Sequence, residues 1–356
     1  MTAGARTGWL GLLLLAVAVV VLGWCLYALD PRALWSVARQ ASPTWLALSA
    51  GAVLARFLIW GLKWQRMLAR RAAVPFLIVL RAILAGSFAN LVTPTFKLAG
   101  GVVRAAVVSR RCGWAMLDAW GYAVADQGTN AVGHLVLYGV VALAAAPHLA
   151  PGAMRAGLAL SGLLVLVTLV GCVVVRRPIW AWALRPAPNR MVAKILRRDP
   201  PRRDEEPYLA RVLRPLVGPG ISRRDWVQDI GLAATSITAV CIANVLVLRA
   251  LGVDAPFAVV ASAVLLSYLA GTVAGIGGGL GVTEAALATI YGQVGMAPST
   301  AAAGVLLHRG MFYVIVLGAG GLAFAAEGRN YLRRSPPGRP VGPSASNGDS
   351  PRLSTP

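Results

Sequence analysis

Charged residues are scarce in this chain, and acidic residues are the scarcest of them. Of its 356 residues only 13% are charged and 57% are hydrophobic, with 34 Lys and Arg against 13 Asp and Glu. Soluble domains average about 25% charged residues, so a soluble globular protein is excluded. Apolar runs cover Trp9–Leu29, 119–154 (interrupted by Asp126), 156–175 and 256–283. Each reaches the ~20 residues needed to cross a bilayer, which predicts an all-α, polytopic membrane protein.

Metal-ligand and disulfide spacings are also lacking. The four cysteines are isolated and the three histidines are scattered along the chain, so we expect no metal site, no cofactor and no redox chemistry. The net charge of +21 would suggest nucleic-acid binding in a soluble protein. Here the basic residues cluster between apolar spans, as the positive-inside rule produces. We therefore expect no nucleic-acid partner.

The flanking charges arrange the apolar runs into six full spans. These are expected at about 8–29, 43–62, 114–146, 156–175, 230–251 and 300–325. The first span is expected to be retained, because residues 24–27 offer no small-residue cleavage site. Lys63, Arg66, Arg70 and Arg71 follow the second span and place that end in the cytoplasm. Six spans then put both termini on the cytoplasmic side of the cell membrane.

Two polar segments lie outside these spans. Residues 176–229 form a basic cytoplasmic loop within the membrane domain 1–334. Its Trp- and Leu-containing stretches are expected to lie on the membrane surface as amphipathic helices. The other interpretation is a solvated basic loop that only fixes topology. Residues 335–356 are rich in Pro, Gly and Ser and are expected to be a disordered tail.

Two apolar segments contain internal breaks. Residues 75–110 are interrupted at 93–95, and residues 256–295 are interrupted by the glycine-rich run 275–281. Basic flanks on the first segment and charge-poor flanks on the second predict two re-entrant hairpins that enter from opposite sides. Broken helices in corresponding places of two halves indicate an inverted repeat and mark a transporter's substrate site. Two ordinary short spans joined by a turn are the other interpretation of 256–295.

Charged residues inside these segments are costly and usually face a cavity or a partner. Arg309 lies near the middle of its span, too far from either end to snorkel. It therefore requires a carboxylate or an anionic ligand, and Asp126 and Glu284 are the acids available. One interpretation is a structural ion pair. The other is an anion site formed by Arg104, Arg309 and Lys97 and tuned by Glu284.

Other polar features of these segments are interpreted more simply. Arg56, inside the second span, could snorkel toward Lys63, and Arg81 lies in the first hairpin. Gly277 to Gly281 allow a head group to approach the backbone closely. They would also expose N–H groups at the start of the following short helix, where anions are favoured.

Three motifs carry a resemblance to a known family. Asn90–Arg104 has the pattern N-x-x-x-P-x-x-[RK]-x-x-G-x-x-x-R, and Gly278–Glu284 reads G-G-L-G-V-x-E. Residues 306–309, Leu-Leu-His-Arg, are followed by Tyr313. Together they resemble the lysylphosphatidylglycerol synthase transmembrane-domain family of flippase-like proteins, over roughly residues 10–325. The chain departs from the family pattern at Gly277, which is usually proline, and at Gly101, which is often acidic.

The resemblance implies a multispan domain that moves lipids between leaflets. Full-length synthases of the family also carry a soluble aminoacyl-transfer domain after the spans. This chain ends soon after its last span, so we expect no lipid aminoacylation and no enzyme activity.

The leading hypothesis is a flippase-like carrier for a membrane lipid with an anionic or polar head group. The alternative is a non-transporting scaffold or regulator that binds a lipid- or glycan-modifying enzyme through 176–229. A membrane-embedded transferase using Asp126, Glu284 and His308 ranks last. The candidate head-group contacts are Asn90, Pro94, Lys97, Gly100, Arg104, Gly278, Gly279, Gly281, Glu284 and Arg309, with Asp126 and Glu284 as charge-coupling residues.

Overall fold

The computed structural model describes residues 31–93, 98–149, 152–174, 176–196, 199, 205–274 and 281–333. Every regular element among these residues is a helix, which confirms the predicted all-α class. The span predicted at 8–29, residues 94–97 and 275–280 at the two predicted breaks, and the tail at 335–356 lie outside the described residues.

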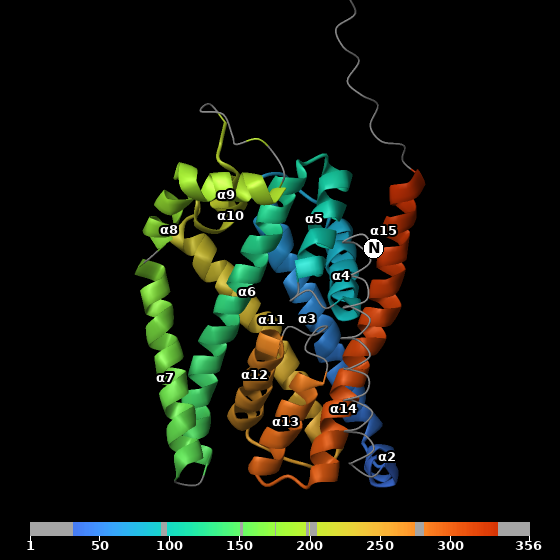
Figure 1. Ribbon diagram of the computed structural model, residues 1–356. Coiled ribbons are helices and arrows are strands. Elements are labelled where there is room, and N and C mark those ends of the chain that lie inside the picture. Colours follow the sequence, from blue (N-terminus) through green and yellow to red (C-terminus); the bar gives the residue numbers. More distant parts are fainter. Residues whose placement is uncertain are drawn as a thin grey trace, which may run out of the picture.

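Long helices form the frame of the bundle (Figure 1). They are α3 (Pro43–Ala69), α6 (Met116–Ala145), α7 (Ala153–Val174), α11 (Arg223–Ala250) and a continuous helix made of α14 (Pro298–Ile315), the π-helical turn η3 (Val316–Gly320) and α15 (Gly321–Arg333). All except α7 are long and apolar enough to cross a membrane, and α7 is apolar over a shorter stretch. The chain is thus a polytopic membrane protein, and the long helices coincide with the predicted spans.

Helices α3 and α11 both extend beyond the predicted spans. Helix α3 continues to Ala69 and α11 begins at Arg223, about two turns past the apolar part of each. The added turns are polar and pair with each other: Arg70 Nη2 lies 2.6 Å from Asp229 Oδ2. Hydropathy alone could not place these ends, because the helices are prolonged by charge pairing rather than by apolar burial.

The two ends of the bundle differ. Helices α8 (Arg176–Ala183), α9 (Pro186–Leu196) and α10 (Tyr208–Val217) lie together at one end, here called the loop end, and α2 (Pro31–Arg39) lies at the opposite end (Figure 1). Helix α10 packs on α6 at Gly121, where a Cβ atom would lie 2.9 Å from the Val212 carbonyl oxygen. The described part of 176–229 is therefore packed structure rather than a plain solvated loop.

Two helical hairpins occupy opposite halves of the bundle. Helices α4 (Phe76–Val92) and α5 (Leu98–Cys112) lie in the loop-end half, and α12 (Phe257–Ala274) and α13 (Val282–Gln293) lie in the other half (Figure 1). Their lengths of 17, 15, 18 and 12 residues fall below the ~20 residues of a full span. Two pairs of short apolar helices in opposite halves are the arrangement that the prediction of re-entrant hairpins requires.

The packing repeats between the two halves. Helix α4 packs on α3 and α5 on α6, just as α12 packs on α11 and α13 on α14. Helices α3 and α11 pack along each other between the halves, where Ser49 Oγ donates to the Ala243 carbonyl at 2.9 Å. The matching order and opposite placement of the hairpins follow the pattern predicted for an inverted repeat.

Small residues allow α4 and α5 to approach closely. A Cβ atom at Gly86 would lie 2.7 Å from the Gly100 carbonyl oxygen and 2.8 Å from Arg104 Cγ. Across the same hairpin, the Gly100 backbone N–H donates to Asn90 Oδ1 at 2.7 Å. Asn90 thereby satisfies one of the free N–H groups in the first turn of α5, as helix starts require.

Substituting Gly86 with Ala tests this close packing. The added methyl group must displace backbone, so Gly86→Ala is expected to lower stability by about 1–3 kcal/mol. The measurement is the thermal unfolding midpoint of the detergent-purified protein. Gly51→Ala in α3 is the matched control, because nothing lies within 4 Å of its Cβ position. Equal midpoints for the two variants would contradict the packing described here.

Candidate functional site

Helix α3 carries a polar face through the bundle. Arg56, Trp60 and Lys63 follow one another at helical spacings of four and three residues, so they lie on one face of the helix. Asp126, Thr129 and Asn130 form a comparable stripe on α6. The two stripes meet, and their contact defines the first of two buried ionic clusters.

Asp126 is the centre of this first cluster. Its carboxylate lies 2.8 Å from Lys63 Nζ, forms an ion pair with Arg104 and accepts a 2.9 Å hydrogen bond from Trp60 Nε1. The side chains of Lys63 and Asp126 are 0% exposed and that of Arg104 is 3% exposed. Three helices, α3, α5 and α6, are thus joined through one acid.

The remaining polar groups of this cluster are also satisfied. Lys63 Nζ donates to Thr129 Oγ1 at 2.9 Å and to Asn130 Oδ1 at 2.8 Å. The Arg104 guanidinium lies 5.0 Å from the ring centre of Trp64, within cation–π range. The sequence-based placement of Lys63 at the cytoplasmic surface is wrong. The helix continues past it, and a carboxylate in the core provides a partner that flanking charge cannot reveal.

Glu284 and Arg309 form the second cluster. Arg309 Nε donates to Glu284 Oε1 at 2.6 Å, and Tyr313 OH donates to the same oxygen at 2.6 Å. The ring of Tyr268 on α12 lies 5.4 Å from the Arg309 guanidinium. Gly281 begins α13 with a φ of 80°, a conformation that glycine adopts readily, and so sets Glu284 in the first turn. Of the two acids considered for Arg309, Glu284 is its partner.

The second cluster is less completely satisfied than the first. The Arg309 and Glu284 side chains are only 7% and 8% exposed. Nevertheless Arg309 Nη2 and Glu284 Oε2 are buried and have no hydrogen-bond partner among the described residues. Buried polar atoms without partners are costly and rare in folded proteins. The pair therefore retains one unused donor and one unused acceptor.

Arg56 lies between the two clusters. It is midway along α3, about 20 Å from either end of the helix, so its guanidinium does not reach the surface by snorkelling. The guanidinium lies 5.5 Å from the ring centre of Phe57, 5.9 Å from Trp60 and 5.4 Å from Phe312. The expectation that Arg56 snorkels is therefore wrong, because aromatic rings hold it inside the bundle.

The aromatic contacts compensate only part of the cost of this charge. No ion pair or side-chain hydrogen bond of the described residues reaches the Arg56 guanidinium. Cation–π contacts contribute about 0.5–2 kcal/mol, whereas a central Arg costs about 2.5–3.5 kcal/mol on insertion scales. Arg56 is thus a partly buried cation to which the described part of the chain supplies no counter-charge.

The rings of Trp60 and Phe312 connect Arg56 to the first and the second cluster, respectively. Trp60 lies 5.2 Å from the Arg104 guanidinium, and Phe312 packs against Tyr313 with ring centres 6.0 Å apart. The polar centre is therefore one continuous layer across α3, α5, α6, α13 and α14, with Arg56 in its middle.

The remaining residues that the sequence singled out lie outside the two ionic clusters or beyond the described residues. Gly100 and Asn90 bind each other across the first hairpin, and Arg81 is exposed on α4. Pro94, Lys97, Gly278 and Gly279 lie outside the described residues. His308 is 2% exposed beside Arg309. The described residues contain no group of three or more His, Cys, Asp or Glu side chains that could hold a metal ion.

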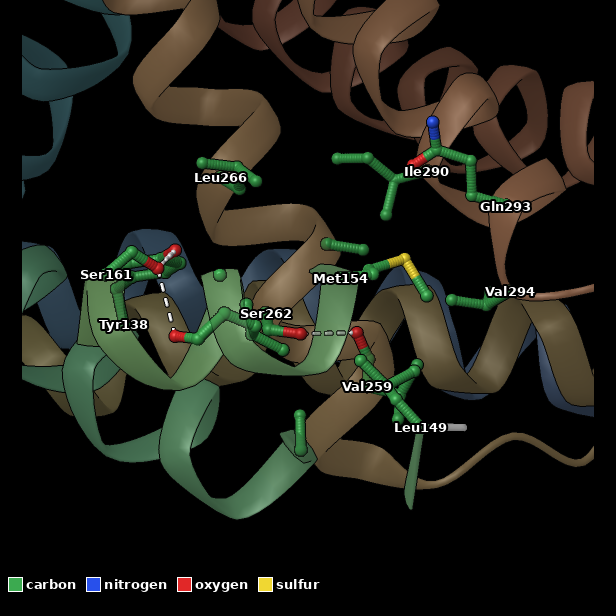
Figure 2. A pocket seen from close by; sticks show the side chains of 14 residues that line it. Tyr138, Leu149, Met154, Ser161, Val259, Ser262, Leu266, Ile290, Gln293 and Val294 are labelled. Carbon is green, nitrogen blue, oxygen red and sulfur yellow. Dashed lines mark hydrogen bonds between the residues drawn. The ribbon is translucent and has the colours of Figure 1, made fainter. Parts of the chain in front are cut away.

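An apolar cavity lies apart from these charges. It has a volume of about 290 Å³ and opens between α6, α7, α12 and α13. The Tyr138 and Ser161 hydroxyl groups form a 2.8 Å hydrogen bond, and Ser262 Oγ donates a 2.9 Å hydrogen bond to the Val259 carbonyl (Figure 2). The lining contains no charged side chain, so this cavity suits hydrocarbon rather than a head group.

Short apolar hairpins in opposite halves of the bundle and buried ionic clusters on the helices beside them characterise this membrane protein. The chain belongs to the family described as the lysylphosphatidylglycerol synthase TM region, which matches residues 9–320. This confirms the resemblance seen in the sequence motifs. A search of the curated proteins found no match.

The central position of Asp126 is tested by comparing two substitutions. Asp126→Asn leaves both Lys63 and Arg104 buried without the carboxylate that pairs with them. It is expected to lower the free energy of unfolding by about 3–5 kcal/mol. Lys63→Met leaves the Arg104–Asp126 pair intact and is expected to lower the free energy of unfolding clearly less than Asp126→Asn does. Thermal unfolding in detergent measures both. The account fails if Lys63→Met proves as damaging as Asp126→Asn.

Proposed function

We propose that this protein moves a lipid with an anionic head group between the two leaflets of the membrane. The observation that carries the proposal is the excess of positive charge buried at the junction of the hairpins. Among the described residues, Arg56, Lys63, Arg104 and Arg309 are set there against two acids, Asp126 and Glu284. Uncompensated charge inside a membrane domain marks a substrate path by default, and an anion would neutralise it.

The architecture supports the same proposal. In transporters built from inverted repeats, the substrate site lies where discontinuous helices of the two halves meet near the midplane. Here α4 and α5 approach from the loop end and α12 and α13 from the opposite end (Figure 1). Rocking of one half against the other would expose the polar layer to each leaflet in turn.

A lipid requires shielding only of its head group during this movement. Its acyl chains remain in hydrocarbon, and the apolar cavity between α7 and α12 offers a suitable surface for them. The proposal assigns no bond-making step to the chain. The family membership supports a lipid-related role in a membrane.

The proposal also assigns an orientation. The loop end carries many basic residues, including Arg66, Arg70 and Arg111, whereas few lie at the end that holds α2. The positive-inside rule then places the loop end in the cytoplasm, with the protein in the cell membrane.

Leaflet exchange in proteoliposomes tests the function. Fluorescent phosphatidylglycerol and phosphatidylcholine are compared by quenching from outside, with empty liposomes as the baseline. Wild-type protein is expected to speed exchange of the anionic lipid. The double variant Arg309→Gln/Glu284→Gln removes both charges of the second cluster, so no unpaired charge remains there. Because a charge-assisted hydrogen bond contributes about 1.5–3 kcal/mol, we expect its exchange rate to fall about tenfold or more.

Arg81→Gln is the control, because Arg81 is an exposed cation of α4 that takes part in no ion pair among the described residues. Its exchange rate is expected to match wild type. Exchange that persists in the folded double variant would overturn the role of the second cluster. Absence of exchange by wild type, for every lipid and with an imposed pH gradient, would favour a non-transporting partner of a lipid- or glycan-modifying enzyme.

A further inference from the structure

We propose that the two clusters have different roles, and that Arg56 and Arg309 form a binding site for the phosphate of a lipid head group. Arg104 in this proposal is a structural cation. The inference rests on the proposed function and deepens it, because it names the side chains that hold the head group and the chemical group they recognise.

The first cluster has no capacity left for a ligand. Both oxygens of Asp126 are engaged, by Lys63, Arg104 and Trp60. Lys63 Nζ has two further acceptors, Thr129 and Asn130. The Arg104 guanidinium contacts its carboxylate and two indole rings. A head group could reach Arg104 only by displacing Asp126, which holds three helices together.

The second cluster, Glu284 and Arg309, has polar atoms available for a ligand. Arg309 and Glu284 are more than nine-tenths buried, yet Arg309 Nη2 and Glu284 Oε2 have no partner among the described residues. The pair uses Arg309 Nε and Glu284 Oε1 for their mutual bond. The free Nη2 can therefore donate to an anion while the ion pair stays intact.

Arg56 supplies the second half of the site. Its guanidinium lies 5.4 Å from the ring centre of Phe312. The guanidinium of Arg309 lies 5.6 Å from the ring of Tyr313, and these two rings pack edge to face. Two cations thus flank one aromatic pair.

Phosphate is the group that fits this arrangement best. An anion between the two guanidinium groups would relieve their repulsion, and guanidinium matches phosphate oxygens in geometry and charge. Glu284 neutralises one of the two cations, so the site carries one net positive charge. It should therefore favour a head group with net negative charge over a zwitterion that brings its own cation.

Binding by the purified full-length protein tests the site. Tryptophan emission, which Trp60 beside Arg56 should make sensitive, is titrated with dihexanoyl phosphatidylglycerol, dihexanoyl phosphatidylcholine and glycerol phosphate. Wild type is expected to prefer the anionic lipid. Arg56→Gln is expected to weaken its binding about tenfold, and Arg56→Lys, which keeps the charge, less. Equal binding of glycerol phosphate would show that the site takes free phosphate and would overturn a lipid head group as its ligand.

Thermal unfolding separates the ligand site from the structural cluster. Arg56→Gln removes an uncompensated charge, so its midpoint is expected to stay equal to that of wild type or rise. Arg104→Gln leaves Asp126 paired with Lys63 but removes a link to α5, so its midpoint is expected to fall while affinity for the lipid persists. Arg81→Gln is the control for removal of a positive charge.

The outcomes that overturn the inference are distinct from those that overturn the function. Unchanged lipid affinity in Arg56→Gln, or failure of that variant to fold, would refute the site even if wild type exchanges lipids. Loss of affinity in folded Arg104→Gln alone would assign the head group to the first cluster. Arg56-dependent binding without any leaflet exchange would support the site and refute transport.

Discussion

The carboxylate of Asp126 lies between Lys63 and Arg104, in a region of the bundle that excludes water. Two cations in that setting require a counter-charge, and removing one partner of such a group costs far more than the group contributes to stability. Because Lys63, Arg104 and Asp126 belong to α3, α5 and α6, the requirement fixes the first hairpin against two full spans. The close approach at Gly86 and the bond between Asn90 and Gly100 complete that attachment.

The second half of the molecule uses the same parts with the charges exchanged. In the first half the hairpin helix α5 provides the cation and the full span α6 the acid. In the second half the hairpin helix α13 provides Glu284 and the full span α14 provides Arg309. The first cluster is saturated. Within the described ranges, the second keeps a donor and an acceptor without a partner, and Arg56 lies nearby. This difference allows one half to hold the structure while the other binds and releases a ligand.

Much of the fold could be predicted from the sequence, because apolar length and flanking charge are local properties. The described spans and the placement of the two short hairpins in opposite halves follow from them. Arg309 was identified because a central charge requires a partner. The partners themselves are set by packing between distant segments. Lys63 and Arg56 were therefore misplaced, although their spacing with Trp60 along one face of α3 was a signal. The choice of Glu284 over Asp126 for Arg309 likewise depends on how α13 meets α14.

The central claim is that the excess positive charge holds a lipid phosphate on the Arg56–Arg309 side of the bundle. An electron cryomicroscopy structure of the protein in nanodiscs of phosphatidylglycerol and phosphatidylcholine tests it most directly. The account predicts density for a lipid phosphate within hydrogen-bond distance of both the Arg56 and Arg309 guanidinium groups, with the Arg104–Asp126 pair unbroken. Lipid phosphate bound to Arg104 with that pair opened, or Arg56 extended into the surrounding lipid with no density beside Arg309, would contradict it.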